Sequence, residues 1–138
     1  MNYKKWMIED LQELETLRFA CESLRRELKG IDAEIAAIEG GGRSGEREEW
    51  LLDARARWMD ISENLKATEM HVANMDALLA RLPADELTAV DCLFVDKEGG
   101  GLFSAMDLLH CEKTQVYRIK DRAIMRLARL RWGRGPRE

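Results

Sequence analysis

The chain has 138 residues, of which 46% are hydrophobic and 35% charged, and its formal net charge is −4. This length fits one ordinary domain, or one small domain joined to an extended element. No apolar run approaches the length needed to span a bilayer, and Lys4-Lys5 precedes an acidic amphipathic run where a signal peptide would carry its apolar core. We therefore expect a cytoplasmic protein with no membrane partner.

Three cysteines, Cys21, Cys92 and Cys111, form an odd set without paired spacing. This pattern favours buried thiols in a reducing compartment over a disulfide framework. Cys92, His110 and Cys111 could suggest zinc, but they lack CxxC-like spacing and no fourth ligand is evident. We expect these residues to pack in the core and to bind no metal or cofactor.

The first helix is predicted over about residues 4–39, because its apolar residues recur at alternating steps of three and four. The pattern persists for more than four heptads, which is typical of a coiled coil. Asp10 is the only polar residue that interrupts it. The predicted seam consists of Met7, Leu14, Leu17, Cys21, Leu24, Leu28, Ile31, Ile35 and Ile38.

A glycine-rich segment, residues 39–45, predicts the end of this helix, and Ser44 is a suitable N-cap for the next one. The second helix is predicted over residues 46–82. Its seam consists of Leu51, Ala54, Trp58, Ile61, Leu65, Thr68, Val72, Met75, Leu79 and Leu82.

The two seams have equal length, so folding back about the glycines pairs Ile31 with Trp58 and Leu24 with Leu65. We predict an antiparallel helical hairpin. The alternative is a parallel dimer through the first helix, with the second helix packed outside. A further set of apolar residues lies off the seam and suggests a second buried face, for a dimer or for the C-terminal domain: Leu11, Phe19, Trp50, Leu52 and Leu78.

Two short helices are predicted after Pro83, which breaks the second helix and can open a third. The third has Asp85 and Glu86 in its first turn, and its predicted apolar face consists of Leu87, Val90, Leu93 and Phe94. Residues 96–101 end it. The fourth is predicted over residues 102–110 with Leu102, Ala105, Met106 and Leu109 facing inward, and a tight turn at residues 110–112 follows.

The fifth helix, predicted over residues 113–130, is amphipathic and basic. Its apolar stripe consists of Val116, Ile119, Ala123, Leu127 and Leu130, and Asp121 is its only acid. Residues 112–138 hold nine basic and three acidic residues, whereas residues 1–111 hold thirteen basic and twenty-three acidic ones. An acidic body with a basic end directs a polyanion to that end.

A short helix, a tight turn and a basic helix, preceded by another short helix, are typical of a helix-turn-helix domain. We therefore predict an all-α protein with two parts: a coiled-coil hairpin at residues 1–82 and a helix-turn-helix domain at residues 83–133. Residues 134–138 are predicted to form a flexible tail. The fourth helix would brace the fifth, whose first residues could then reach base edges in the major groove.

Three motifs carry a family resemblance: Leu82-Pro83-Ala84-Asp85-Glu86, Thr114-Gln115-Val116-Tyr117-Arg118 and Lys120-Asp121-Arg122-Ala123. Together with Trp132-Gly133 they resemble region 4 of sigma-70-type factors, and more closely the ArpU/RinA-like regulators of phages and prophages. The likeness covers about residues 82–133. It implies a sequence-specific regulator of phage genes, often late genes, acting at the nucleoid of a bacterial host.

The resemblance and the helix geometry together nominate eight DNA-contacting residues. Lys113, Thr114, Tyr117 and Arg118 fall where such domains touch bases, and Gln115, Lys120, Arg122 and Arg126 fall where they touch phosphates. Arg129, Arg131, Arg134 and Arg137 are expected to be nonspecific phosphate contacts or solvated charges. One departure is Met106, which stands where these motifs usually have Ala or Gly. Either the helices cross more widely, or the alignment is one residue off.

Double-stranded DNA is the expected partner, with no small-molecule substrate. The hairpin would serve either a homodimer or a contact with host RNA polymerase. No nucleophile–base pair, strand-linked phosphate loop or acidic metal cluster is present in the sequence, so we expect no enzyme. The alternative is a coiled-coil adaptor whose basic helix binds an acidic protein and has no DNA preference.

Overall fold

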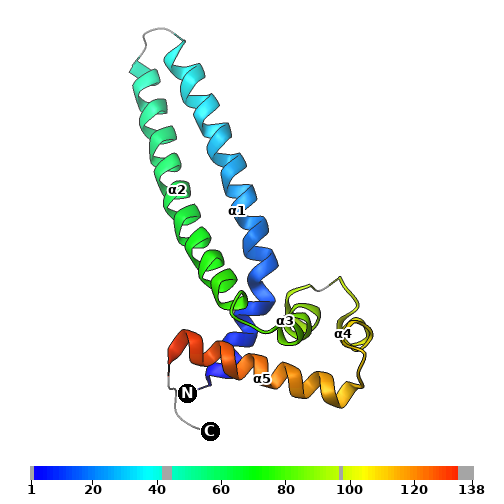
Figure 1. Ribbon diagram of the computed structural model, residues 1–138. Helices are drawn as coiled ribbons and strands as arrows, with labels where there is room; N and C mark the ends of the chain where they lie inside the picture. Colours follow the sequence, from blue (N-terminus) through cyan, green and yellow to red (C-terminus); the bar gives the residue numbers. More distant parts are fainter. Residues whose placement is uncertain (1, 42–44, 97, 134–138) are drawn as a thin grey trace. The chain divides into compact units, whose positions relative to one another are not determined.

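The computed structural model of the chain describes residues 2–41, 45–96 and 98–133, and within these ranges it contains helices and turns but no strand (Figure 1). The predicted all-α class is confirmed. The helices are α1 (Tyr3–Glu39), α2 (Gly45–Leu79), α3 (Ala84–Val90), α4 (Gly101–Leu109) and α5 (Lys113–Trp132). A π-helical turn, Asp91–Val95, extends α3 directly.

Helices α1 and α2 pack against each other as an antiparallel hairpin, as predicted (Figure 1). The predicted start and end of α1 agree with the structure to within one residue, but α2 ends at Leu79 and not at residue 82. Arg81 and Leu82 already donate to the carbonyls three residues before them. Pro83 explains this early end, because it cannot donate a backbone hydrogen bond and disfavours helical geometry in the residue before it.

Ion pairs join the two helices within residues 16–72. Arg57 binds Glu34 at 2.8 Å, and Arg25 binds Glu69 at 3.5 Å. Hydrogen bonds from its side chain to Glu34 and Asp53 raise the pKa of Arg57. The partners run in opposite directions along the chain, as an antiparallel pair requires. The individual seam pairs, such as Ile31 with Trp58, remain predictions.

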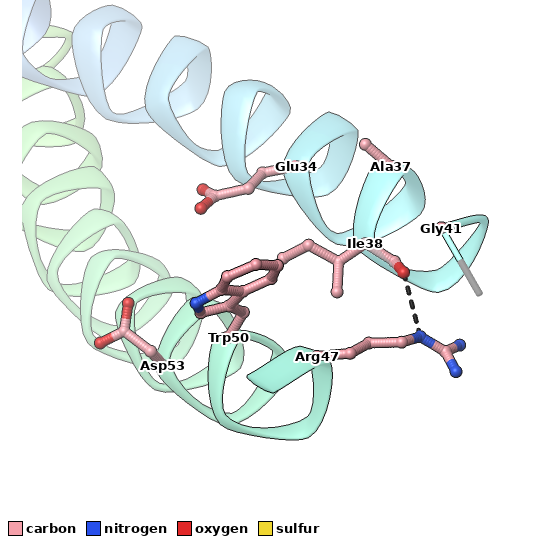
Figure 2. Close-up of a pocket in the computed structure, with 7 residues that line it drawn as sticks. All are labelled: Glu34, Ala37, Ile38, Gly41, Arg47, Trp50 and Asp53. Atoms are coloured by element: carbon pink, nitrogen blue, oxygen red, sulfur yellow. Dashed lines mark hydrogen bonds between the residues drawn. The ribbon is translucent and has the colours of Figure 1, made fainter. Parts of the chain in front are cut away.

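Arg47 closes the tip of the hairpin. Its Nε donates to the carbonyl of Ile38 at 3.0 Å and its Nη2 to the carbonyl of Glu39 at 2.9 Å, so it satisfies acceptors that the end of α1 leaves free. Figure 2 shows Arg47, its bond to the carbonyl of Ile38, and Trp50 around an open groove of about 440 Å³. The predicted N-cap, Ser44, lies outside the described residues.

The contacts group the chain into two compact units: Thr16–Val72, and Met1–Glu15 with Ala73–Glu138. The predicted boundary between residues 82 and 83 remains a prediction, but this grouping places the first turns of α1 with the C-terminal helices. The fully buried side chains of this unit include Leu11, which was predicted to lie off the seam. The other large side chains that are fully buried in it are Met7, Leu14, Met75, Val90, Val116 and Leu127.

The two ends of this unit meet through aromatic and charged side chains. Trp132 stacks on Tyr3 with ring centroids 5.2 Å apart and meets Trp6 edge-on. Arg131 pairs with Asp10 and reaches the Sδ atom of Met75 at 3.8 Å. Asp10, the polar interruption of the first seam, is therefore the ion-pair partner of the last turn of α5. The expectation that Arg131 is a solvated or phosphate-binding charge is wrong.

Candidate nucleic-acid interface

Helices α3 and α4 both pack against α5, and α4 lies at the N-terminal end of α5 (Figure 1). Cys92, Ala105 and Val116 form the buried centre where the π-helical turn, α4 and α5 meet. Ala105 has no exposed surface, whereas Met106 is half-buried. A small residue, Ala105, therefore lies at the centre of this packing, one position before Met106.

A left-handed residue makes the turn between α4 and α5. His110 has φ 52° and ψ 45°. The backbone N–H of Cys111 donates to the carbonyl of Met106 at 3.2 Å, a bond that reaches back across this turn and closes the end of α4. Glu112 is extended, and α5 begins at Lys113 as predicted. The tight turn predicted at residues 110–112 is therefore present.

The buried face of α5 consists of Val116, Ile119, Ala123, Ile124 and Leu127. Four of these five were predicted. Leu130 was wrongly included, because 46% of its surface is exposed, and Ile124 was missed. With 3.6 residues per turn, this face leaves Thr114, Arg118 and Arg129 on the opposite, exposed side.

Arg118 lies near the centre of the exposed side and, within the described ranges, has no hydrogen-bond or ion-pair partner. Thr114 lies one turn before it and is also exposed. Asp121, the one acid of α5, follows on the same side and accepts an ion pair from Lys120 at 2.9 Å. Arg118 is thus a cation free to bind an external group, next to a hydroxyl that can do the same.

Lys113, Tyr117 and Lys120 form one flank of this side. The Nζ atoms of Lys113 and Lys120 lie 5.8 and 5.2 Å from the centroid of the Tyr117 ring. The ring is partly exposed and carries positive charge at two of its sides, an arrangement that suits contact with a sugar–phosphate backbone.

The other flank carries Gln115, Arg122 and Arg126, and two of these bind acids of α3. Arg122 approaches Asp85 at 3.4 Å, with both side chains largely exposed. Arg126 donates two hydrogen bonds to Glu86, from Nε to Oε1 at 3.0 Å and from Nη2 to Oε2 at 3.3 Å. These hydrogen bonds and the charge of Glu86 raise the pKa of Arg126. Arg126 therefore holds α3 and α5 together, and Gln115 is exposed without such a contact.

Glu86 lies in the first turn of α3, as predicted, and is only 3% exposed. The predicted apolar face of this helix was partly wrong, because Leu87 is exposed whereas Ala89, Cys92 and Val95 are buried with Val90. The π-helical turn accounts for the buried positions that follow. The N–H of Asp96 donates to Asp91 five residues back, which shifts the helical phase.

The ion pair between Glu86 and Arg126 was missed by the sequence analysis. A signal for it was present, because Glu86 lies three and four residues before Ala89 and Val90 and shares their face. An acid at such a position needs a basic partner, and the arginines of the predicted fifth helix were the available ones.

Within the described parts of the chain, no three His, Cys, Asp or Glu side chains lie close enough to hold a metal ion. None of the helices described is both long and apolar enough to cross a membrane. All three cysteines are free thiols, and burial, with the nearby Asp91, raises the pKa of Cys92.

No protein-family model, curated protein or solved structure gives a significant match to this chain.

Proposed function

We propose that this protein is a sequence-specific regulator of transcription that binds double-stranded DNA by placing α5 in the major groove. The observation that carries the proposal is the exposed side of α5. Its N-terminal half presents Thr114 and the unpartnered Arg118, while α3 and α4 cover the back of the helix. Guanine offers an arginine at such a position two acceptors side by side.

The surrounding charges support this placement. Lys113 and Lys120 flank Tyr117 beside the exposed side, and Arg129 lies on it three turns after Arg118. The first turn of α5 also presents backbone N–H groups at the positive end of the helix dipole. Lys120, Arg129 and these backbone N–H groups would bind phosphates and fix the helix in the groove, and Arg118 would read a base.

Contacts within the chain favour different roles for the eight nominated residues. Arg126 is committed to Glu86, so we no longer expect it to bind phosphate as its main role. Arg122 has a longer, exposed contact with Asp85 that DNA could replace. The proposed base contacts are Thr114 and Arg118 with Lys113 and Tyr117 beside them, and the proposed phosphate contacts are Gln115, Lys120, Arg122 and Arg129.

The resemblance to ArpU/RinA-like regulators, and to sigma region 4, supports control of phage genes as the biological role. Host RNA polymerase and a second copy of the chain are the proposed protein partners of the hairpin. This role requires no catalysis and no cofactor.

Fluorescence anisotropy with labelled duplexes tests DNA binding, first with a randomised pool and then with the sequences that the protein selects from it. Neutralising about three to five phosphates gives log K a slope of roughly −3 to −4.5 against log salt. Arg118→Ala should flatten the preference among sequences, whereas Arg129→Ala should weaken all sequences alike. Arg81→Ala removes the same charge outside α5 and is the matched control.

The alternative function is a coiled-coil adaptor whose basic helix binds an acidic protein. The exposed Phe19, Leu52, Met59 and Met70 of the hairpin favour a protein partner. Under this alternative, duplex DNA is ignored at low salt, and that result would exclude the regulator. Equal effects of Arg118→Ala and Arg81→Ala would remove α5 as the reading helix.

A further inference from the structure

A second heptad pattern runs along α2 on the side away from its seam with α1. It consists of eight positions spaced alternately by four and three residues, which we call the outer seam: Leu52, Ala56, Met59, Glu63, Lys66, Met70, Ala73 and Ala77. Every one of these residues is exposed. The seam that faces α1 uses other residues, among them Ala54 and Leu65, which are buried.

The outer seam leaves large apolar side chains in water. Leu52, Met59 and Met70 are 68%, 55% and 67% exposed. Scattered apolar residues on a surface are normal, but these three follow one stripe of a single helix at heptad spacing. The small alanines between them would allow another helix to approach closely. A stripe of this kind is half of a coiled-coil interface.

The order of residues along the seam indicates what covers it. About a point between residues 64 and 65, Met59 mirrors Met70, Ala56 mirrors Ala73, and Glu63 mirrors Lys66. When two copies of α2 lie antiparallel about this point, each residue faces its mirror position in the other copy. The methionines and alanines then meet their own kind, and both copies place an acid opposite a base.

Glu63 and Lys66 are available for this pairing. Both are exposed, and in the described parts of the chain neither has an ion-pair or hydrogen-bond partner. Their neighbours differ in this respect, since Arg57 is held by Glu34 and Asp53, and Glu69 by Arg25. In a parallel pair of the same seams, Glu63 would face Glu63 and Lys66 would face Lys66. Charge therefore selects the antiparallel arrangement.

We propose that the outer seam binds the outer seam of a second copy of this chain, antiparallel and about a twofold axis. Glu63 of each copy pairs with the partner's Lys66 at the centre, and the methionines pack on both sides. From Leu52 to Met70 the contact runs along about 28 Å of helix. The dimer does not depend on DNA binding, so either proposal can fail without the other.

Charge reversal at the centre tests the dimer by sedimentation velocity at low salt, from micromolar to millimolar protein. The wild-type chain should show a monomer–dimer equilibrium. Glu63→Lys places two bases opposite each other at both central contacts, and Lys66→Glu places two acids there. Each single variant should weaken the dimer at least about tenfold. Glu27→Lys, an exposed reversal on α1, is the matched control and should leave the dimer unchanged.

Two further samples separate this pairing from a general effect of charge. The double variant Glu63→Lys/Lys66→Glu restores both central contacts with opposite polarity and should dimerise like the wild type. An equal mixture of the two single variants should form a heterodimer as strong as the wild-type dimer, although each variant alone dimerises more weakly. Circular dichroism of each variant confirms that the helices are retained.

A wild-type chain that stays monomeric at all concentrations overturns the proposal and leaves the seam to a different partner. Single variants that dimerise as strongly as the wild type overturn it as well, because they place the contact elsewhere or in a parallel pair. A double variant that fails to recover excludes the pairing of Glu63 with Lys66.

Discussion

Leu11 offers a direct test of how the C-terminal helices are held. Its side chain is fully buried in the unit that combines the first turns of α1 with α3, α4 and α5. Leu→Ala at such a site removes buried methyl groups and leaves a cavity, at a cost of about 2–5 kcal/mol. Small domains have about 5–15 kcal/mol of stability in total, so the loss is a large share of it.

The effect should reach α5, although α5 lies more than a hundred residues away along the chain. Amides of the buried face of α5, such as those of Val116 and Leu127, exchange hydrogen only when the unit opens. A loss of about 2 kcal/mol or more accelerates their exchange at least roughly thirtyfold. Native-state hydrogen exchange read by mass spectrometry, together with urea unfolding, measures both quantities in one variant.

Leu108→Ala is the matched control, because the same truncation there removes a side chain that is 60% exposed. It should change the free energy of unfolding by less than about 0.5 kcal/mol. The reasoning is refuted when Leu11→Ala lowers the urea midpoint but leaves exchange in α5 at the wild-type rate. Such a result would instead support an independent C-terminal domain with its boundary between residues 82 and 83.

Three other changes probe single contacts. Arg126→Ala should lower the urea midpoint more than Glu86→Ala, because only the first leaves a buried carboxylate without its partner. The double variant should recover part of the loss caused by Arg126→Ala. Equal losses in the two single variants would contradict this role of Arg126. Burial raises the pKa of Cys92 from its ordinary value of 9.0, so the folded state holds this proton more tightly. The contribution of Cys92 to the free energy of unfolding is therefore present below pH 9.0 and is lost as the pH rises further. The resulting fall of the urea midpoint above pH 9.0 should be absent in Cys92→Ala. His110 has φ 52°, a left-handed conformation that glycine adopts without strain and valine does not. His110→Gly should therefore stabilise the chain by about 0.5–1 kcal/mol, and His110→Val should destabilise it. The opposite order of melting temperatures would exclude strain at this turn.

The sequence predicted the helices well because their signals are local. Heptad spacing, the glycine segment and Pro83 act within a few residues, and the predicted bounds of α1, α4 and α5 agree with the structure to within two residues at each end. The π-helical turn was not predictable in this way. A π-helical turn shifts the phase of a helix by hydrogen bonds that span five residues, and the spacing of apolar residues before it does not reveal this shift. The buried face predicted for the third helix was therefore partly wrong.

The nominated DNA-contacting residues show the same division. Periodicity placed Thr114 and Arg118 opposite the buried stripe of α5, and the structure has them exposed there. It could not separate Arg118 from Arg126, because both are arginines outside the predicted stripe. The difference comes from Glu86, forty residues earlier, whose carboxylate is buried against Arg126.

The sequence alone determined the all-α class, the two long helices and the basic amphipathic character of α5, since these follow from spacing and composition along the chain. Only the tertiary structure decided that the first turns of α1 pack with the C-terminal helices. It also decided that Asp10 forms an ion pair with Arg131, and that Arg126 forms one with Glu86. The physical reason is that a buried charge needs a partner in space, and its identity depends on how distant helices meet.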